Sequence, residues 1–155
     1  MMISRSLGLK KKILVMHGAN VNMLGERETG IYGKETLDSI NRQIAEYAQS
    51  LNLECEIYHS NIEGEIITKI QEAKDRFDGI ALNAGAYTHY SYAIRDALAS
   101  VTMPKMEIHI SDITQREEFR KISVTAPVCN GQIYGHGLAG YLEAMEKVAN
   151  LIRKG

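Results

Sequence analysis

The segment from Met106 to Arg120 carries side chains that can do acid–base chemistry on one face of an expected strand. Apolar residues at 106, 108 and 110 alternate there with Glu107, His109 and Ser111. Because successive side chains of a strand point to opposite faces, these polar groups share one side, roughly 6.5 Å apart. Burying a carboxylate and an imidazole is unfavourable unless they are paired, so we expect a strand end that opens into a polar site. An edge strand with one solvated face explains the same alternation and stays open at this point.

A second pair of chemically useful residues, Arg27 and Tyr32, lies in a glycine-bounded stretch from 18 to 33 that contains four glycines. We expect this long stretch to be a loop without regular structure, which in a compact domain is usually functional. A tyrosine in such a loop is usually a packing residue, yet a nearby guanidinium favours its phenolate form. Acting as a base near neutral pH requires lowering the tyrosine pKa from about 10, at a free-energy difference of about 4 kcal/mol.

The elements that must position these residues follow from apolar periodicity. Expected strands cover residues 13–16, 53–58, 79–82, 105–110 and 132–134. Expected helices cover 37–51, behind a cap at Thr36, and 66–77, 91–100 and 138–152. The alternation reads as β-α-β-α throughout, which requires crossover connections. It therefore predicts an α/β fold with a single doubly wound, five-stranded parallel sheet, flavodoxin-like in arrangement.

Polar clusters at 18–22, 83–89 and 109–112 follow three of these strands. Ligands of open α/β sheets bind beyond the carboxyl ends of the strands, so we expect the three clusters to meet at one edge. His89 and His109 are the histidines of interest there. His17 is more simply a satisfied structural group, whereas we expect His59 and His136 at the surface or in loops.

Length and composition favour one domain acting on a small molecule. The chain has 155 residues, 45% of them hydrophobic, which suffices for one core, and a net charge of -1, which attracts neither nucleic acid nor anionic membranes. We expect residues 1–155 to form a single catalytic domain, with residues 1–11 as a flexible N-terminal tail. Cys55 and Cys129 match no metal or redox spacing, and no signal peptide or spanning segment is evident, so we expect a cytoplasmic protein.

Glycine-rich motifs and histidines indicate no cofactor. The run Gly135–Gly140 matches a dinucleotide fingerprint, but the chain ends before the second strand and acidic residue that this motif needs. The run Gly18–Gly25 lacks the lysine that closes a phosphate-binding loop. The five histidines show no paired ligand spacing. We therefore predict neither a nucleotide nor a metal.

Several blocks along the chain have distinctive residues: His17–Arg27, Ile31–Gly33, Ser60–Gly64, Asn83–His89, Arg95–Ala97 and Glu107–Arg120. Taken together and in order, they resemble the type II 3-dehydroquinate dehydratases, from about Ile13 to Leu151. The chain departs from the usual residues of that family at His17, Ala19 and Tyr90, and at Asp112, which adds a negative charge beside the expected anionic ligand.

The resemblance implies dehydration of 3-dehydroquinate to 3-dehydroshikimate in the shikimate pathway, without cofactor or metal, by a dodecamer built as a tetramer of trimers. Such a dehydration needs a base for the α-proton, stabilisation of the enolate and an acid for the departing hydroxyl. Matched motif by motif, the resemblance implies that Tyr32 is the base, that Arg27 lowers the pKa of Tyr32, and that His109 is the acid. It implies that Glu107 orients His109 and that Asn20 holds a water at the enolate oxygen. The residues implied to bind the substrate are Asn83, His89, Asp96 and Arg120 for the ring hydroxyls and the backbone amides around Ile110 and Ser111 for the carboxylate.

Other classes of function remain to be weighed. A flavodoxin-like module that binds flavin without catalysis would leave Tyr32, His109 and Arg120 without a role. A phosphoacceptor signalling domain would need an aspartate where Asn83 ends the third strand. No lysine lies at the carboxyl end of an expected strand, which argues against a Schiff-base dehydratase.

Overall fold

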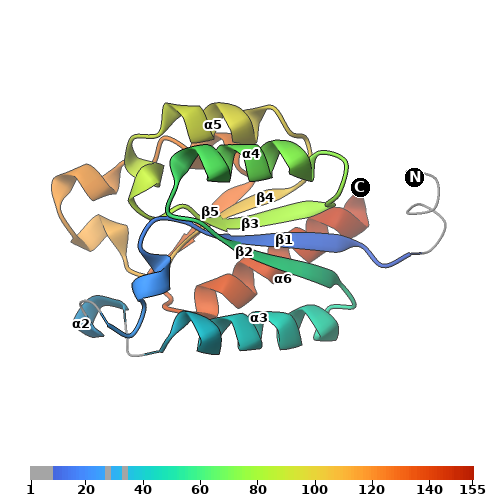
Figure 1. Ribbon diagram of the computed structural model, residues 1–155, viewed down its shortest axis with the longest axis horizontal. Coiled ribbons are helices and arrows are strands. Elements are labelled where there is room, and N and C mark those ends of the chain that lie inside the picture. The colour runs from blue at the N-terminus through green and yellow to red at the C-terminus, as the bar shows by residue number, and fades with distance from the viewer. Residues whose placement is uncertain (1–8, 27–28, 33–34) are drawn as a thin grey trace.

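Figure 1 shows the computed structural model of the protein, which describes residues 9–26, 29–32 and 35–155. Within this part, the side chains of Thr29 and Tyr32 are not described. We expected a tail over residues 1–11. Residues 1–8 of it lie outside the described residues, whereas residues 9–11 are described, are exposed and have no regular structure.

The five strands form one parallel sheet in the order β2-β1-β3-β4-β5, which confirms the doubly wound arrangement. β4 lies between β3 and β5, so the alternative reading of this segment as an edge strand is wrong. The strands are β1 (Lys12–His17), β2 (Glu54–His59), β3 (Gly79–Asn83), β4 (Lys105–His109) and β5 (Gly131–Tyr134).

Helices cover both faces of the sheet. Helices α4 (Glu63–Ala73) and α5 (Tyr92–Ala99) lie on one face, while α3 (Leu37–Ser50) and α6 (Ala139–Lys154) lie on the other (Figure 1). Alternate residues of β1 accordingly belong to two separate cores: Ile13 and Val15 pack towards α3 and α6, and Leu14 and Met16 pack towards α4 and α5. This two-sided burial explains why the central strands are apolar at successive positions.

The start of α3 forms as its sequence predicts. The Thr36 hydroxyl accepts a hydrogen bond from the backbone N–H of Ser39 at 3.2 Å, and Asp38 places a carboxylate in the first turn. Both features stabilise the positive end of the helix dipole and satisfy one of its free N–H groups. Ser91 caps α5 in the same way, through the N–H of Ile94 at 3.0 Å.

Two sequence expectations about the connections are wrong. The stretch 18–33 is not structureless, because its described part contains a 3₁₀ turn, η1 (Val21–Met23), and a short helix, α2 (Thr29–Tyr32). The link from β4 to β5 holds no α-helix, so the β-α alternation is not continuous. This link lacks an apolar stripe of helical length and contains Pro127, and it folds instead into three 3₁₀ turns, η3 (Ile113–Gln115), η4 (Glu118–Lys121) and η5 (Ala126–Val128).

Candidate active site

A cavity of about 110 Å³ opens at the carboxyl edge of the sheet, where the three polar clusters meet as expected. Its walls come from the segments that follow β1, β3 and β4. None of the described residues that line it is a lysine. The lining residues are Ala19, Asn20, Val21, Leu24, Asn83, Gly85, Ala86, His89, His109, Ile110, Ser111, Ile113, Arg116 and Arg120.

Close backbone packing joins the segments after β1 and β3. The N–H of Gly18 donates to the carbonyl of Asn83 at 2.6 Å, and the N–H of Ala19 donates to that of Ala84 at 3.3 Å. A Cβ at Gly18 would lie 2.4 Å from the Ala84 oxygen, and Gly85 adopts a positive φ of 66° beside Ala19. These two glycines allow the contact that brings the first two walls of the cavity together.

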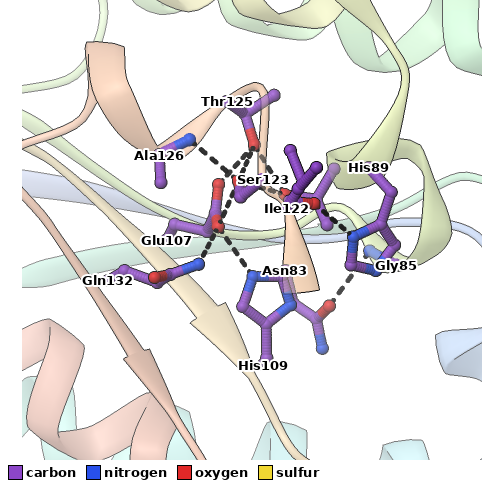
Figure 2. Close-up of polar contacts among 11 residues, drawn as sticks. Asn83, Gly85, His89, Glu107, His109, Ile122, Ser123, Thr125, Ala126 and Gln132 are labelled. Carbon is purple, nitrogen blue, oxygen red and sulfur yellow. Dashed lines mark hydrogen bonds and ion pairs between the residues drawn. The ribbon is translucent and has the colours of Figure 1, made fainter. Parts of the chain in front are cut away.

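The strongest chemical feature is an imidazole paired with a buried carboxylate at the end of β4. Figure 2 shows the His109 ring beside Glu107, whose Oε2 lies 2.7 Å from the ring Nε2. Glu107 is 1% exposed and His109 is 5% exposed. Because a carboxylate can only accept, Nε2 carries the proton of this bond, which leaves Nδ1 as the second nitrogen of the ring.

Three further side chains donate to the Glu107 carboxylate (Figure 2). Ser123 and Gln132 donate to Oε2 at 2.8 Å each, and the Thr125 hydroxyl donates to Oε1. Burial alone would raise the pKa of Glu107. The hydrogen bond and charge of His109, with the hydroxyls of Thr125 and Ser123, more than offset burial and hold that pKa below its ordinary value. Glu107 is therefore an ionised carboxylate that accepts the Nε2 proton of His109.

His89 stacks beside His109 with ring centroids 6.2 Å apart and planes 19° from parallel. Its Nδ1 donates to the carbonyl of Ile122 at 2.7 Å. Burial, followed by the charges of His109 and Arg120, lowers the pKa of His89, although the bond to Ile122 opposes the shift. His89 is accordingly neutral near pH 7, and its Nε2 presents a lone pair that can accept a hydrogen bond from a ligand hydroxyl.

Two guanidinium groups line the side of the cavity formed by η3 and η4. Arg116 donates to the Ser111 hydroxyl at 3.3 Å. Arg120 donates to Glu117 at 3.0 Å and lies over the Phe119 ring, 4.7 Å from its centroid. The cavity therefore holds fixed positive charge, which suits an anionic ligand.

Most of the predicted site residues meet in this one place. Glu107 lies behind the cavity, in contact with His109. Asp96 does not join them, because it is exposed on α5 and does not line the cavity. Arg27 lies outside the described residues, and for Tyr32 the backbone alone is described. The predicted residues that line the cavity are Asn20, Asn83, His89, His109, Ile110, Ser111 and Arg120.

The residues that hold Glu107 were not predicted. Ser123, Thr125 and Gln132 reach it from the segment after η4 and from β5, and Thr88 joins the two hydroxyls at 2.6 and 3.0 Å. The one available signal was a polar residue, Gln132, at the start of an expected strand. This polar residue can be interpreted only when the register of β4 and β5 is known, because the register places Gln132 opposite Glu107.

The other histidines and Asp112 are only partly as expected. His17 is fully buried and hydrogen-bonded to Tyr141 and Asn41, as a structural group should be. His136 is exposed beside Glu143, but His59 is a half-buried strand residue rather than a surface or loop residue, because β2 extends to it. Asp112 caps η3 through the N–H of Thr114 at 3.0 Å and does not line the cavity, so the expectation of added charge beside an anionic ligand is wrong.

Within the described part of the chain, no group of three or more His, Cys, Asp or Glu residues is placed to hold a metal ion. None of the helices described there is long and apolar enough to cross a membrane.

Comparison with known proteins points to one family. The family model described as dehydroquinase class II matches residues 11–149. The chain is 57% identical over 145 residues to the 3-dehydroquinate dehydratase of Lachnospira eligens, which covers 92% of this chain and 99% of that protein. It is 50% identical to the same enzyme of Bacillus cereus, over 93% of this chain and 99% of that protein.

Solved structures give the same result. The type II dehydroquinase of Butyrivibrio crossotus superposes with a TM-score of 0.89 at 58% identity, over 91% of this chain and 99% of that one. The type II dehydroquinase of Propionibacterium acnes superposes with a TM-score of 0.88 at 39% identity, over 92% of this chain and 98% of that one.

Proposed function

We propose a mechanism for this chain from the premise that it belongs to the dehydroquinase class II family. It is a hydro-lyase, and its reaction is the dehydration of 3-dehydroquinate in the shikimate pathway. The observation that carries the mechanism is the buried, hydrogen-bonded pair of His109 and Glu107 beside the cavity. We propose that the reaction proceeds through an enolate to 3-dehydroshikimate.

His109 is the general acid in this mechanism. Glu107 holds the Nε2 proton of the ring, so the proton delivered to the departing hydroxyl comes from Nδ1. The fixed carboxylate keeps a proton on Nε2, so the ring has one tautomer after the transfer. The hydroxyl leaves as water once it has taken up this proton. The acid thus gives one proton to the substrate and the base takes one from it.

Tyr32 is the general base, and Arg27 is the cation that lowers its pKa. The support is their place in the sequence and the position of α2, which lies on the side of the sheet where the strands end (Figure 1). The stretch 18–33 closes over the bound substrate as a lid and removes the phenolate from water. Asn20 holds the water that donates a hydrogen bond to the enolate oxygen.

Substrate binding uses the remaining groups of the cavity. The lone pair on Nε2 of His89, the amide of Asn83 and the guanidinium of Arg120 bind ring hydroxyls. Backbone amides around Ile110 and Ser111 bind the carboxylate. The fixed positive charge of Arg116 and Arg120 supports this placement of an anion.

The expected dodecamer gives the exposed Asp96 a place in the mechanism. Tyr90, Tyr92, Phe119 and Ile122 are between 55% and 67% exposed, and Phe119 contacts His89 at the cavity. Burying these apolar side chains between copies of the chain is favourable, and Asp96 on α5 would then reach the cavity of a neighbouring subunit. We propose a homo-oligomer, a tetramer of trimers, that acts in the cytoplasm.

Ultraviolet absorbance tests the activity, because the conjugated enone of the product absorbs where the substrate does not. We expect the absorbance to rise when 3-dehydroquinate is added to chelator-treated protein. The variant Tyr32→Phe keeps the ring and removes the base, so turnover should fall by about 10²- to 10⁴-fold while substrate binding persists. Folded wild-type protein that gives no rise would refute the activity, and a fully active Tyr32→Phe variant would refute the base.

A further inference from the structure

A network of hydrogen bonds runs from helix α3 along the carboxyl edge of the sheet to the cavity. The Nε2 of His17 lies 2.7 Å from Oδ1 of Asn41 on α3, and its Nδ1 lies 2.9 Å from the hydroxyl of Tyr141 on α6. The amide nitrogen of Asn83 donates to the same hydroxyl at 3.0 Å. Its oxygen accepts from the N–H of Gly85 at 3.0 Å (Figure 2). The network thus ends on an amide that lines the cavity.

The direction of every bond in this network follows from its ends. The backbone N–H of Gly85 can only donate, so the atom of Asn83 that faces it is the oxygen. The nitrogen of that amide must then donate to Tyr141. At the other end, the oxygen of Asn41 accepts from Nε2–H of His17, which leaves Nδ1 to accept from the Tyr141 hydroxyl.

The opposite tautomer of His17 does not satisfy the same groups. With the proton on Nδ1, both His17 and Asn83 would donate to the Tyr141 oxygen. The hydroxyl proton of Tyr141 would then lose its acceptor in a side chain that is 0% exposed. An unsatisfied buried hydroxyl is unfavourable, so the tautomer with the proton on Nε2 is fixed by its surroundings.

We propose that His17, Asn41 and Tyr141 are positioning residues, which together hold the Asn83 amide in one orientation towards the substrate. The proposal rests on the proposed function, because Asn83 binds a ring hydroxyl there. The amide nitrogen carries two hydrogens, of which Tyr141 needs one, so the fixed orientation directs the second for recognition.

The network holds only while His17 is neutral. Burial lowers the pKa of His17 to about 4, against a smaller opposing effect of the bond to Asn41 and with help from the nearby His59. The imidazole therefore remains an acceptor at Nδ1 through the physiological range. The orientation of Asn83 is accordingly independent of pH wherever the enzyme would work.

The decisive variant is Tyr141→Phe, which removes the central hydroxyl and changes no substrate-contacting group. We expect KM for 3-dehydroquinate to rise about tenfold with kcat changed less than about twofold, because the loss falls on ground-state and transition-state binding alike. Tyr47→Phe is the matched control. Its hydroxyl also links α3 to α6, through Glu146 at 3.3 Å, but it does not reach Asn83, so KM should stay unchanged.

A second variant, Asn41→Leu, keeps the proposal testable if Tyr141→Phe does not fold, because Asn41 is only half-buried and lies near the start of α3. This variant removes only the hydrogen bond to His17 at the end far from the cavity, and we expect KM for 3-dehydroquinate to rise about threefold. Nitrogen-15 NMR of the histidine rings reports the tautomer directly. The wild type should show His17 protonated on Nε2, and Asn41→Leu should show a mixture of tautomers.

A role in stability alone predicts lower melting temperatures with unchanged KM in the folded protein, and that result would overturn the proposal. Wild-type His17 protonated on Nδ1 would overturn it as well. The first outcome can be measured only on an active wild-type enzyme, and the second does not depend on activity. They are therefore distinct from failure of the proposed function, in which the wild type itself does not turn over.

Discussion

His17 ends β1 and His109 ends β4, and both imidazoles are buried at the carboxyl edge of the same sheet, at 0% and 5% exposure. Their partners differ. His17 lies between an amide and a hydroxyl, whereas His109 lies against a carboxylate that accepts from three other side chains. Because the hydrogen-bond partners of His17 carry no charge, burial is the largest effect on the pKa of His17 and lowers it to about 4. The ring of His109 instead donates its Nε2 proton to a fixed negative charge.

The comparison teaches that strand position and burial do not distinguish the two histidines. The residues within hydrogen-bonding distance do. A carboxylate accepts the Nε2 proton of His109, whose ring lines the cavity and which we propose as the acid, whereas an amide and a hydroxyl make His17 part of the scaffold behind the cavity.

Removing the acid gives the largest expected effect. His109→Ala should lower turnover by about 10³-fold, because general acid catalysis contributes about 10²- to 10⁴-fold. His136→Ala is the control, since it removes an exposed histidine with its own glutamate partner and should leave turnover unchanged. Steady-state rates from product absorbance measure both, and a near-normal rate for His109→Ala would place the acid elsewhere.

The neutral histidine should appear in the pH dependence of stability. The folded pKa of about 4 lies below the ordinary value of 6.5, so the unfolded chain binds the proton first as the pH falls. The stability that His17 contributes is full above pH 6.5 and is lost towards pH 4, by about 3 kcal/mol. His17→Asn should flatten this part of the curve. Urea unfolding at several pH values tests it, and an equally steep curve in the variant would contradict the neutral assignment.

The smallest expected effect sharpens the charged side of the comparison. Thr125→Val removes one donor to Glu107 at nearly constant volume and should lower the free energy of unfolding by about 1 to 2 kcal/mol. Because the pKa of Glu107 is held below 4.5, this loss is full above that pH and shrinks as the carboxylate is protonated. Thr114→Val removes an exposed hydroxyl from Asp112 and serves as the control. Equal losses in both variants would mean that burial adds nothing to the Glu107 site.

Strand alternation correctly indicated that Glu107 and His109 share a face, because the period of a strand is a local property. The three polar clusters were correctly brought to one edge, because parallel topology fixes where strand ends lie. The partners of Glu107 could not be predicted. Ser123, Thr125 and Gln132 lie 16, 18 and 25 positions away in the sequence, and their contact depends on the path from β4 to β5.

Asp96 shows the opposite failure. Its motif matched the family, yet a motif does not state whether a side chain faces the cavity of its own chain. In this chain the residue is exposed on α5 and does not line its own cavity. The role of Tyr141 could not be predicted for another reason. Its place on the apolar face of α6 does not indicate that its hydroxyl joins His17 to Asn83.

The sequence by itself determined the parallel α/β order, the Thr36 cap, the shared face of Glu107 and His109 and the family, because each depends on local periodicity or on linear motifs. Tertiary structure alone decided that His17 is neutral, because Asn41 of α3 and Tyr141 of α6 reach its ring only through packing between elements. It also decided that Glu107 stays ionised beside His109, because the side chains that donate to Glu107 come from the connection after β4 and from β5.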